Sequence, residues 1–498
     1  MRWACAATLS ALLLLGWLLA GWCGLQQDEA LFLRAIDYPD SCAFSVREGR
    51  IALMVMPYVG ALKAALYWPY LKVVSADAFT LRLPMVFLVP VLAGLSLWFW
   101  SRLASGAAVV LTAALLIAHP HFTAPVVLDW GPVGLQLLFT LLAMHAYRRQ
   151  SFALVGLLAG LMVWDKAVAV WVLTAVTAAA AIFYPGRLRP LLHWRVVTAF
   201  LLGASPYLYF RLMTPNAMAG FRTDIDFSTL QPKLDALRGT LNGTAVALYV
   251  FPVPEAPPRI GLLAAFAGLA ILGFAVRRRL PAFFWTATLG ALAAMLLTGG
   301  AGGSVHHHVL VWPLLGAAVC STLAVLPVPR WTLFAAAGLV AVVQFQTWSL
   351  YWRGAEQGTH REWTDATGPV AAYLSQPGVC PGGVYALDWG FSENLNALSR
   401  GRYQVTTIAD EWWQPTLPPA QAAIAAQRAA DPHACLLEWA DGAAPFFPGI
   451  RAAAGPALDA RPSRVFLNRR QRPSIRFFET PPPPASTPPA TPARPVSY

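Results

Sequence analysis

Long apolar stretches, separated by short polar ones, fill the first 350 residues of this chain. Eleven of them are long enough, or nearly so, to cross a bilayer, which takes about 20 residues. They cover residues 3–24, 83–101, 103–118, 131–147, 152–164, 167–184, 196–212, 261–276, 282–298, 309–326 and 331–350. The pattern predicts an all-α polytopic membrane bundle of about 11 transmembrane helices.

Three stretches decide this count. Residues 3–24 favour an uncleaved first span, with a cleaved signal peptide as the alternative. Residues 51–74 are apolar but contain two prolines and two lysines, so we expect a helix lying in the outer membrane interface. Residues 152–184 are too long for one span, and arginines flank them on both sides. We therefore expect two crossings there, with Asp165 and Lys166 at the turn.

Composition supports a membrane protein. Of 498 residues, 57% are hydrophobic and 12% are charged, against about 25% charged in an ordinary soluble chain. These values exclude a cytosolic enzyme and a disordered protein. The net charge of +12 would suggest nucleic acid in a soluble chain. Here the positive excess lies among the membrane segments, so we expect membrane lipids and no nucleic acid as partners.

The charges also predict an orientation. With the N-terminus in the cytoplasm, as the positive-inside rule suggests, the cytoplasmic face carries eleven arginines and no acid. All twelve acids of residues 1–349 then fall on the opposite face. Because acids contribute little to topology, their gathering on one side needs another reason.

The chain divides into three predicted parts. Residues 1–352 form the transmembrane domain, whose outer loop 25–82 holds interfacial helices. Residues 353–479 form a small extracytoplasmic α/β domain, and residues 480–498 a proline-rich disordered tail. The domain alternates strand-like stretches (383–387, 434–439, 464–467) with helix-like ones (364–375, 420–430). Cys380 and Cys435 both lie outside, where a disulfide is possible but is not determined by the sequence.

Two acids of the outer loops are candidate catalytic groups. Asp28 directly follows the first span and precedes Glu29, and Asp129 lies at the outer mouth of the fourth span. Each aspartate could simply be a helix N-cap. The functional alternative for Asp28 is a general base at the membrane surface that also touches a metal. A carboxylate at the edge of the hydrocarbon is costly, which makes Asp129 a functional candidate as well.

Cations of the same predicted face could hold an anion. Lys166 is either a snorkelling partner of Asp165 or a point charge for a phosphate. His306, His307 and His308 follow a glycine-rich loop, and at most two of them can face one site from a regular helix. Otherwise they are interfacial histidines of a flexible loop. Together these groups suit a phosphorylated lipid headgroup and an acceptor hydroxyl.

At these residues the chain resembles the GT-C fold glycosyltransferases that use lipid-linked sugars. It is most similar to bacterial relatives of protein O-mannosyltransferases and of the lipid A aminoarabinose transferase. The resemblance covers roughly residues 1–350. Its motifs are Asp28-Glu29-Ala30, residues 57–63 with 81–83, residues 128–132, and the glycine-rich span that ends in Asp165-Lys166. The histidines at 306–308 depart from the Arg-Tyr of many members.

The resemblance implies a bacterial inner-membrane enzyme, for which the charges and the span count predict a cytoplasmic N-terminus and a periplasmic C-terminus. It would move a sugar from a polyprenyl-phosphate donor to an acceptor hydroxyl, with inversion. Asp28 would be the general base, with Glu29 and Asp129 also catalytic. Lys166, His306 and His307 would bind the donor phosphate. Asp28 and Asp129 would hold a divalent metal (Mg²⁺ or Mn²⁺) if the reaction uses one; otherwise Asp129 would orient the donor.

Three alternatives stay open from the sequence. A transporter usually has paired repeats and polar groups near the bilayer midplane, whereas these spans contain almost no ionisable residues. A polymerase or ligase of lipid-linked glycans would share the donor but would not need Asp28 directly after the first span. A scaffold subunit would tolerate Asp28→Asn and Asp129→Asn.

Overall fold

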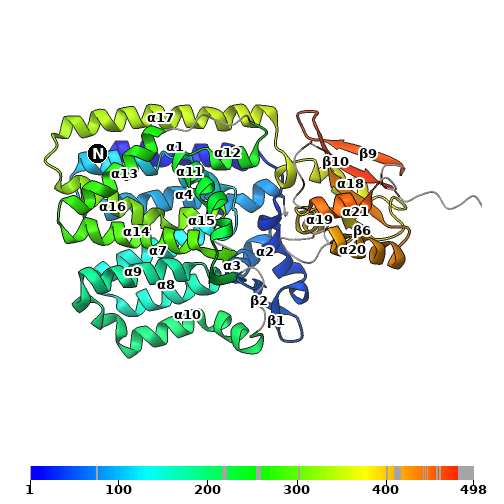
Figure 1. Ribbon diagram of the computed structural model, residues 1–498, viewed down its shortest axis with the longest axis horizontal. Helices are drawn as coiled ribbons and strands as arrows, with labels where there is room; N and C mark the ends of the chain where they lie inside the picture. Colours follow the sequence, from blue (N-terminus) through cyan, green and yellow to red (C-terminus); the bar gives the residue numbers. More distant parts are fainter. Residues whose placement is uncertain are drawn as a thin grey trace, which may run out of the picture. The chain divides into compact units, whose positions relative to one another are not determined.

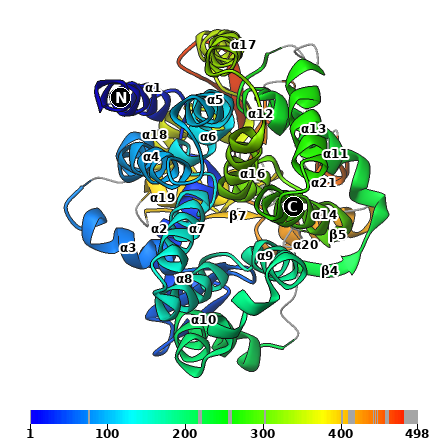
Figure 2. The same cartoon turned by 90° about the vertical axis from the view of Figure 1, so that its left-hand side faces the viewer.

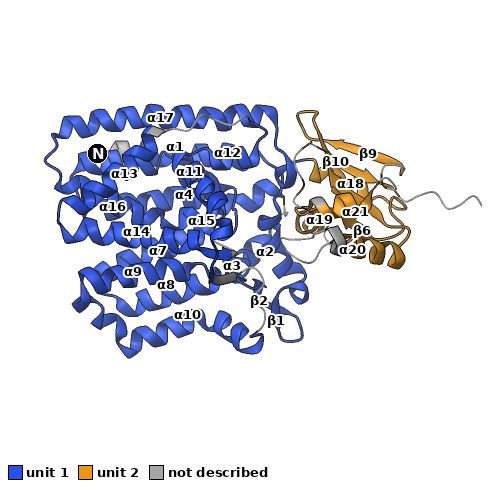
Figure 3. Cartoon of the chain, in the orientation of Figure 1, with its two compact units in different colours: residues 1–365 blue, residues 366–498 orange. Residues whose placement is uncertain are grey.

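The computed structural model consists of two compact units, residues 1–365 and 366–498 (Figure 3). It describes residues 2–479 except 75–76, 216–220, 254–259, 301–302, 400–401, 409–416, 441, 443–444, 446, 456–457 and 459–460. The predicted proline-rich tail, residues 480–498, lies outside the described residues.

The first unit is a helical bundle. Each predicted apolar stretch falls on one helix, except 309–326, which begins with the 3₁₀ turn Val309–Val311. The helices are α1 (Arg2–Ala20), α4 (Ala78–Trp100), α5 (Gly106–Leu116), α7 (Val133–Arg148), α8 (Phe152–Asp165), α9 (Ala169–Phe183), α10 (Trp194–Met213), α13 (Ile260–Ala275), α14 (Arg279–Leu297), α16 (Trp312–Val325) and α17 (Arg330–Gln357).

Length and composition support part of the predicted span count. Among the described residues, five helices are long and apolar enough to cross a membrane. They become six if α5 and α6 (Pro120–Val127), which are bent by 55°, form one span. Other predicted spans are shorter helices, such as α8 with 14 residues and α9 with 15. The chain is a multi-pass membrane protein, and the count of eleven spans remains a prediction.

Burial differs between the centre and the edge of the bundle. Seen end-on in Figure 2, α16 lies among other helices, and all but its C-terminal residues are buried. In contrast, α10 and α17 expose large apolar side chains, including Leu202, Leu212 and Phe345. An exposed apolar face of this kind suits contact with lipid, because lipid tails are as apolar as these side chains.

The loop after α1 is a small folded layer at the end of the bundle opposite the N-terminus (Figure 1). It contains α2 (Gln27–Asp37), β1 (Phe44–Val46), β2 (Ile51–Met56), β3 (Val59–Gly60) and α3 (Leu62–Leu71). The prediction of a helix over residues 51–74 is therefore wrong in its first half. The stretch 51–56 pairs antiparallel with β1 and β3, and such pairing overrides the local preference of an apolar segment.

Residues 152–184 form two helices, as expected, and the crossing of the membrane by each of them remains a prediction. The break between α8 and α9 falls at Lys166. The tip of this hairpin joins the first loop, because Val59 and Lys166 form an antiparallel bridge and the Ala167 amide donates to the Tyr58 carbonyl at 2.9 Å. The hairpin thus carries Lys166 onto the layer that begins with α2.

The second unit contains a five-stranded mixed sheet in the order β7-β6-β8-β10-β9. Its strands are β6 (Val384–Ala386), β7 (Val405–Thr407), β8 (Cys435–Trp439), β9 (Ser463–Leu467) and β10 (Pro473–Phe478). The helices are α18 (Thr367–Leu374), α19 (Ser392–Ser399), α20 (Leu417–Ala430) and α21 (Pro448–Ala454). A disulfide joins Cys380 to Cys435. The unit begins at Ala366 rather than at the expected residue 353, because α17 and the 3₁₀ turn Arg361–Trp363 belong to the bundle.

Candidate active site

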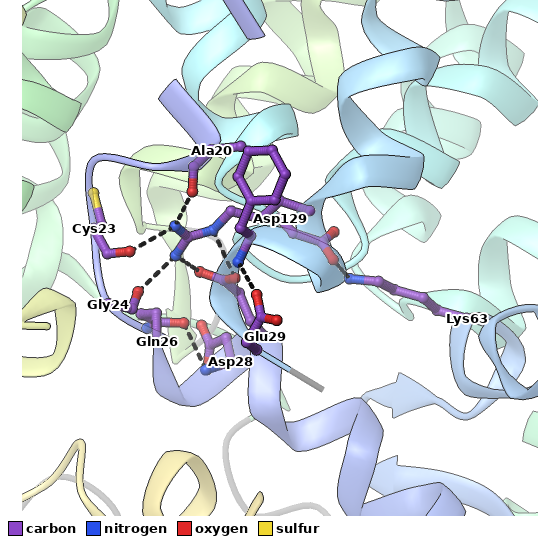
Figure 4. A network of polar contacts seen from close by, with 11 residues as sticks. Ala20, Cys23, Gly24, Gln26, Asp28, Glu29, Lys63 and Asp129 are labelled. Atoms are coloured by element: carbon purple, nitrogen blue, oxygen red, sulfur yellow. Dashed lines mark hydrogen bonds and ion pairs between the residues drawn. The ribbon is translucent and has the colours of Figure 1, made fainter. Parts of the chain in front are cut away.

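The two acids of α2 have different surroundings. The side chain of Gln26 caps the helix by accepting from the Asp28 amide at 2.6 Å, so the N-cap alternative for Asp28 is wrong. Glu29 is buried and accepts from Arg82 through both oxygens, at 2.6 and 2.9 Å (Figure 4). Asp28 is only half-buried. The motif therefore combines an acid held within the fold and an acid at the edge of a site.

Arg82 fixes the path of the chain between α1 and α2. Its guanidinium also donates to the carbonyls of Ala20, Cys23 and Gly24, at 2.7 to 2.9 Å (Figure 4). The planar, five-donor guanidinium suits this combination of a carboxylate and several carbonyls. Glu29 and Arg82 thus hold the turn that presents Asp28.

Asp129 lies in the turn between α6 and α7. Its φ of +52° is rare for a residue other than glycine, and α7 begins later, at Val133, with Pro132 as N-cap. The N-cap alternative for Asp129 is therefore also wrong. The buried carboxylate forms an ion pair with Lys63 of α3 (Figure 4), whose ammonium lies 4.2 Å from the centre of the Phe32 ring.

Lys166 is brought to the same turn by close backbone packing. A Cβ added to Gly60 would lie 2.1 Å from the Trp164 carbonyl oxygen, so only glycine allows this approach. A Cβ added to Gly131, whose φ is +67°, would lie 3.1 Å from Lys166 Nζ and 3.9 Å from His306 Nε2. The Gly131 backbone therefore lies beside both predicted phosphate ligands.

The three consecutive histidines are buried and divide between two surroundings. They form α15 (Val305–His308). The His306 ring centre lies 4.9 Å from that of Trp130 and 4.2 Å from that of His307. His308 instead lies beside Thr240 of α11 (Leu230–Asn242), with 3.3 Å between Nδ1 and Oγ1. This arrangement agrees with the expectation that at most two histidines share a site.

Aromatic rings connect the acidic and basic sides of the site. The Trp130 indole lies close enough to the Asp28 carboxylate to lower its pKa. Its ring also contacts His306, and it lies 4.6 Å from Tyr249 and 5.3 Å from Trp363 between ring centres. Trp130 therefore lies between the candidate base and a candidate phosphate ligand.

Burial shifts the pKa values of Asp28 and Lys166, the two groups that face each other across the site. Desolvation raises the pKa of Asp28 above its ordinary value of 3.8, although Lys166, Lys63 and the Trp130 hydrogen bond oppose the shift. Desolvation lowers the pKa of Lys166 from 10.5 to about 8, and the Asp28 carboxylate opposes this shift. A raised carboxylate pKa improves a general base, and Lys166 is mostly cationic at neutral pH.

The expected metal does not fit the residues present. Asp129 already pairs with the Lys63 ammonium, and Asp28 faces Lys166, so a divalent cation would be repelled by two positive charges. Within the part of the chain that the structure describes, no three His, Cys, Asp or Glu side chains lie close enough to hold a metal ion. We therefore derive no step through a metal.

The structure adds residues that the sequence did not single out. Lys63 and Arg82 lie in two of the motifs that resemble the family, but the sequence assigned them no role. In the structure both are buried partners of acids. Each is a cation inside an apolar stretch, which was the available signal. Tyr249 and Glu362 come from segments distant in the sequence, and nothing in the local pattern points to them.

Comparisons with known proteins support the fold. No protein-family model matches this sequence, and no curated protein matches it. Among solved structures, the chain is similar to ArnT from Cupriavidus metallidurans bound to undecaprenyl phosphate, with a TM-score of 0.57 and 13% identity. The apo structure of ArnT gives a TM-score of 0.60 and the same identity. Each match covers 95% of this chain and 97% of the other. The predicted resemblance is thus confirmed at the level of fold, and the chain has the GT-C architecture of ArnT.

Proposed function

We propose that this protein is a membrane glycosyltransferase that moves a sugar from a polyprenyl-phosphate donor to an acceptor hydroxyl. The observation that carries the proposal is the arrangement of Asp28, Trp130, Lys166 and His306 around one turn of the bundle. The carboxylate can accept the proton of an acceptor hydroxyl, and the cation can bind the donor phosphate. The fold agrees with this function, since ArnT has been solved with undecaprenyl phosphate bound.

In the proposed reaction Asp28 is the general base. The acceptor oxygen attacks the anomeric carbon of the sugar while its proton passes to the Asp28 carboxylate. The bond from the sugar to the phosphate oxygen breaks, and the phosphate leaves with the electron pair. A single displacement inverts the anomeric centre. A positioned base of this kind contributes about 10²–10⁴-fold to a rate.

The remaining residues have supporting roles in this proposal. Lys166, with His306 and His307 beside it, stabilises the negative charge that gathers on the leaving phosphate. Asp129 holds Lys63 next to the site, and Glu29 holds Arg82 beneath it. We thus move Glu29 from the catalytic residues to the positioning residues, because Arg82 occupies both its oxygens.

The orientation in the membrane is part of the proposal. We place the N-terminus in the cytoplasm and the site at the extracytoplasmic face of a bacterial inner membrane. All twelve acids of residues 1–349 then fall on the outer face, and the cytoplasmic face carries eleven arginines and no acid. A reporter fused after residue 352 should then be outside the cytoplasm, and one fused after Arg279 inside it.

Lipid analysis of a deletion strain tests the function. Loss of the transferase should cause one polyprenyl-phosphate sugar to accumulate, because its consumption stops. The wild-type gene should remove the accumulated lipid, and an Asp28→Asn gene expressed at the same level should not. An unchanged lipid profile in the deletion strain, or full rescue by Asp28→Asn, would contradict the proposal.

A further inference from the structure

The segment after the last long helix returns to the loop that carries Asp28. The chain turns at Gly358, with φ +91°, and forms the 3₁₀ turn Arg361–Trp363. The Gly24 amide donates to the Trp363 carbonyl at 2.8 Å. A Cβ on Gly24 would lie 2.0 Å from the Thr364 carbonyl oxygen. Residues 361–364 are therefore seated directly on the approach to α2.

This contact adds a third ring to the aromatic group at the site. Trp363 is fully buried and meets Trp130 edge-on, and Tyr249 of α12 (Ala245–Val250) packs on Trp130 as well. Trp130 also lies beside Asp28 and His306. These rings therefore border the place that the sugar would occupy between the base and the phosphate.

Glu362 brings a carboxyl group to the same place. Its side chain is fully buried. The Tyr249 hydroxyl and the Asp28 carboxylate lie close enough to influence its pKa, which burial raises to about 8. Neither Glu362 oxygen meets full hydrogen-bond geometry with another side chain among the described residues. A buried carboxyl without good partners is costly and requires an explanation.

We propose that Glu362 binds a hydroxyl group of the transferred sugar, in a subsite that it forms with Tyr249 and Trp130. The inference rests on the proposed function and extends it to sugar recognition. An aromatic ring suits the apolar face of a sugar, and a carboxyl group supplies the polar contacts that a sugar edge needs. When protonated at neutral pH, Glu362 both donates to and accepts from sugar hydroxyls.

The proposal separates two parts of donor binding. Lys166 and the histidines bind the phosphate, which every polyprenyl phosphate carries. Glu362 binds a hydroxyl group that only the sugar-loaded lipid carries. A variant of Glu362 should therefore change the preference for a sugar-loaded lipid over the bare lipid, whereas general damage to the site would weaken both.

Binding measurements on the purified full-length protein in lipid nanodiscs test this separation. The probes are undecaprenyl phosphate and the same lipid carrying glucose, galactose, mannose or arabinose. The wild type should prefer at least one sugar-loaded lipid. Glu362→Leu should weaken binding of that lipid about tenfold, the value of one hydrogen bond, and leave the bare lipid unchanged. Glu362→Gln should keep most of the preference, because an amide also donates and accepts.

Two further variants complete the design. Glu356→Leu alters an exposed acid in the last turn of α17, which accepts from Trp352, and should bind all lipids as the wild type does. Tyr249→Phe should also reduce the sugar preference, and it serves as the test if Glu362→Leu does not fold. A Glu362→Leu protein that keeps the preference, or that loses both lipids equally, overturns the sugar subsite. A wild type that binds neither lipid instead overturns the proposed function itself.

Discussion

Asp28 and Glu29 are neighbours on one helix, but they lie in two different environments. Adjacent helical residues point about 100° apart. Glu29 points to Arg82, where both its oxygens are satisfied and both partners are buried. Asp28 points to the edge of the site, towards Lys166 and Trp130. The comparison indicates that a buried carboxylate paired through both oxygens maintains structure, whereas a half-buried carboxylate beside a cation is available for chemistry.

The Asp28 environment predicts the largest effect. Asp28→Asn removes the base but keeps the size of the side chain, so we expect transfer to fall by about 10²–10⁴-fold. The thermal stability of the protein should stay unchanged, because no buried ion pair is broken. The measurement is sugar transfer in proteoliposomes together with thermal unfolding in detergent. If Asp28→Asn lowered stability and left transfer intact, the two environments would have been assigned the wrong way round.

The Glu29 environment predicts a loss of stability instead. Glu29→Gln leaves the Arg82 guanidinium buried without its counter-charge, which costs about 3–5 kcal/mol for pairs of this kind. We expect a clear drop in the unfolding temperature, or little folded protein after purification. The variant Glu48→Gln is a matched control in the same loop, since Glu48 forms only an exposed contact with Arg50. Equal stability of the two variants would remove Glu29 from the positioning role.

The pH dependence of sugar transfer should depend on the Asp28 environment and not on the Glu29 environment. It is the smallest of the three expected effects. As pH falls, Asp28 becomes protonated at a pH above the ordinary 3.8, and kcat decreases. As pH rises through about 8, Lys166 loses its proton, and KM for the donor increases up to about tenfold per pH unit. Lys166→Arg should shift the alkaline limb upward, because arginine keeps its charge. An alkaline limb that stays at the same pH in Lys166→Arg would assign it to another group.

Local patterns were informative where one physical requirement dominates. Lipid requires long apolar helices, so the positions of the long helices could be predicted from hydropathy. The two consecutive helices within residues 152–184 were predicted from the length of the apolar stretch and from the arginines that flank it. Residues 51–56 were predicted incorrectly, because their apolar composition suits a helix or a strand and only the pairing with β1 decides.

Roles within the site were less predictable than positions. The sequence selected Asp28, Asp129, Lys166 and His306–His308 because they are ionisable groups of loops predicted at the same membrane face. It could not show that Asp129 pairs with Lys63, or that Glu29 is occupied by Arg82. These pairings join residues far apart in the chain, and no local spacing encodes them.

The sequence by itself determined that this protein is built of membrane helices, because burial in lipid sets helix length, and it predicted that the acids gather on one face. Only the tertiary structure decided which acid meets which cation. It also brought residues 361–364 back to the first loop, through a backbone contact at Gly24 that no residue pattern announces. Long-range packing assigns partners, and partners decide whether a buried carboxyl group holds the fold or faces a substrate.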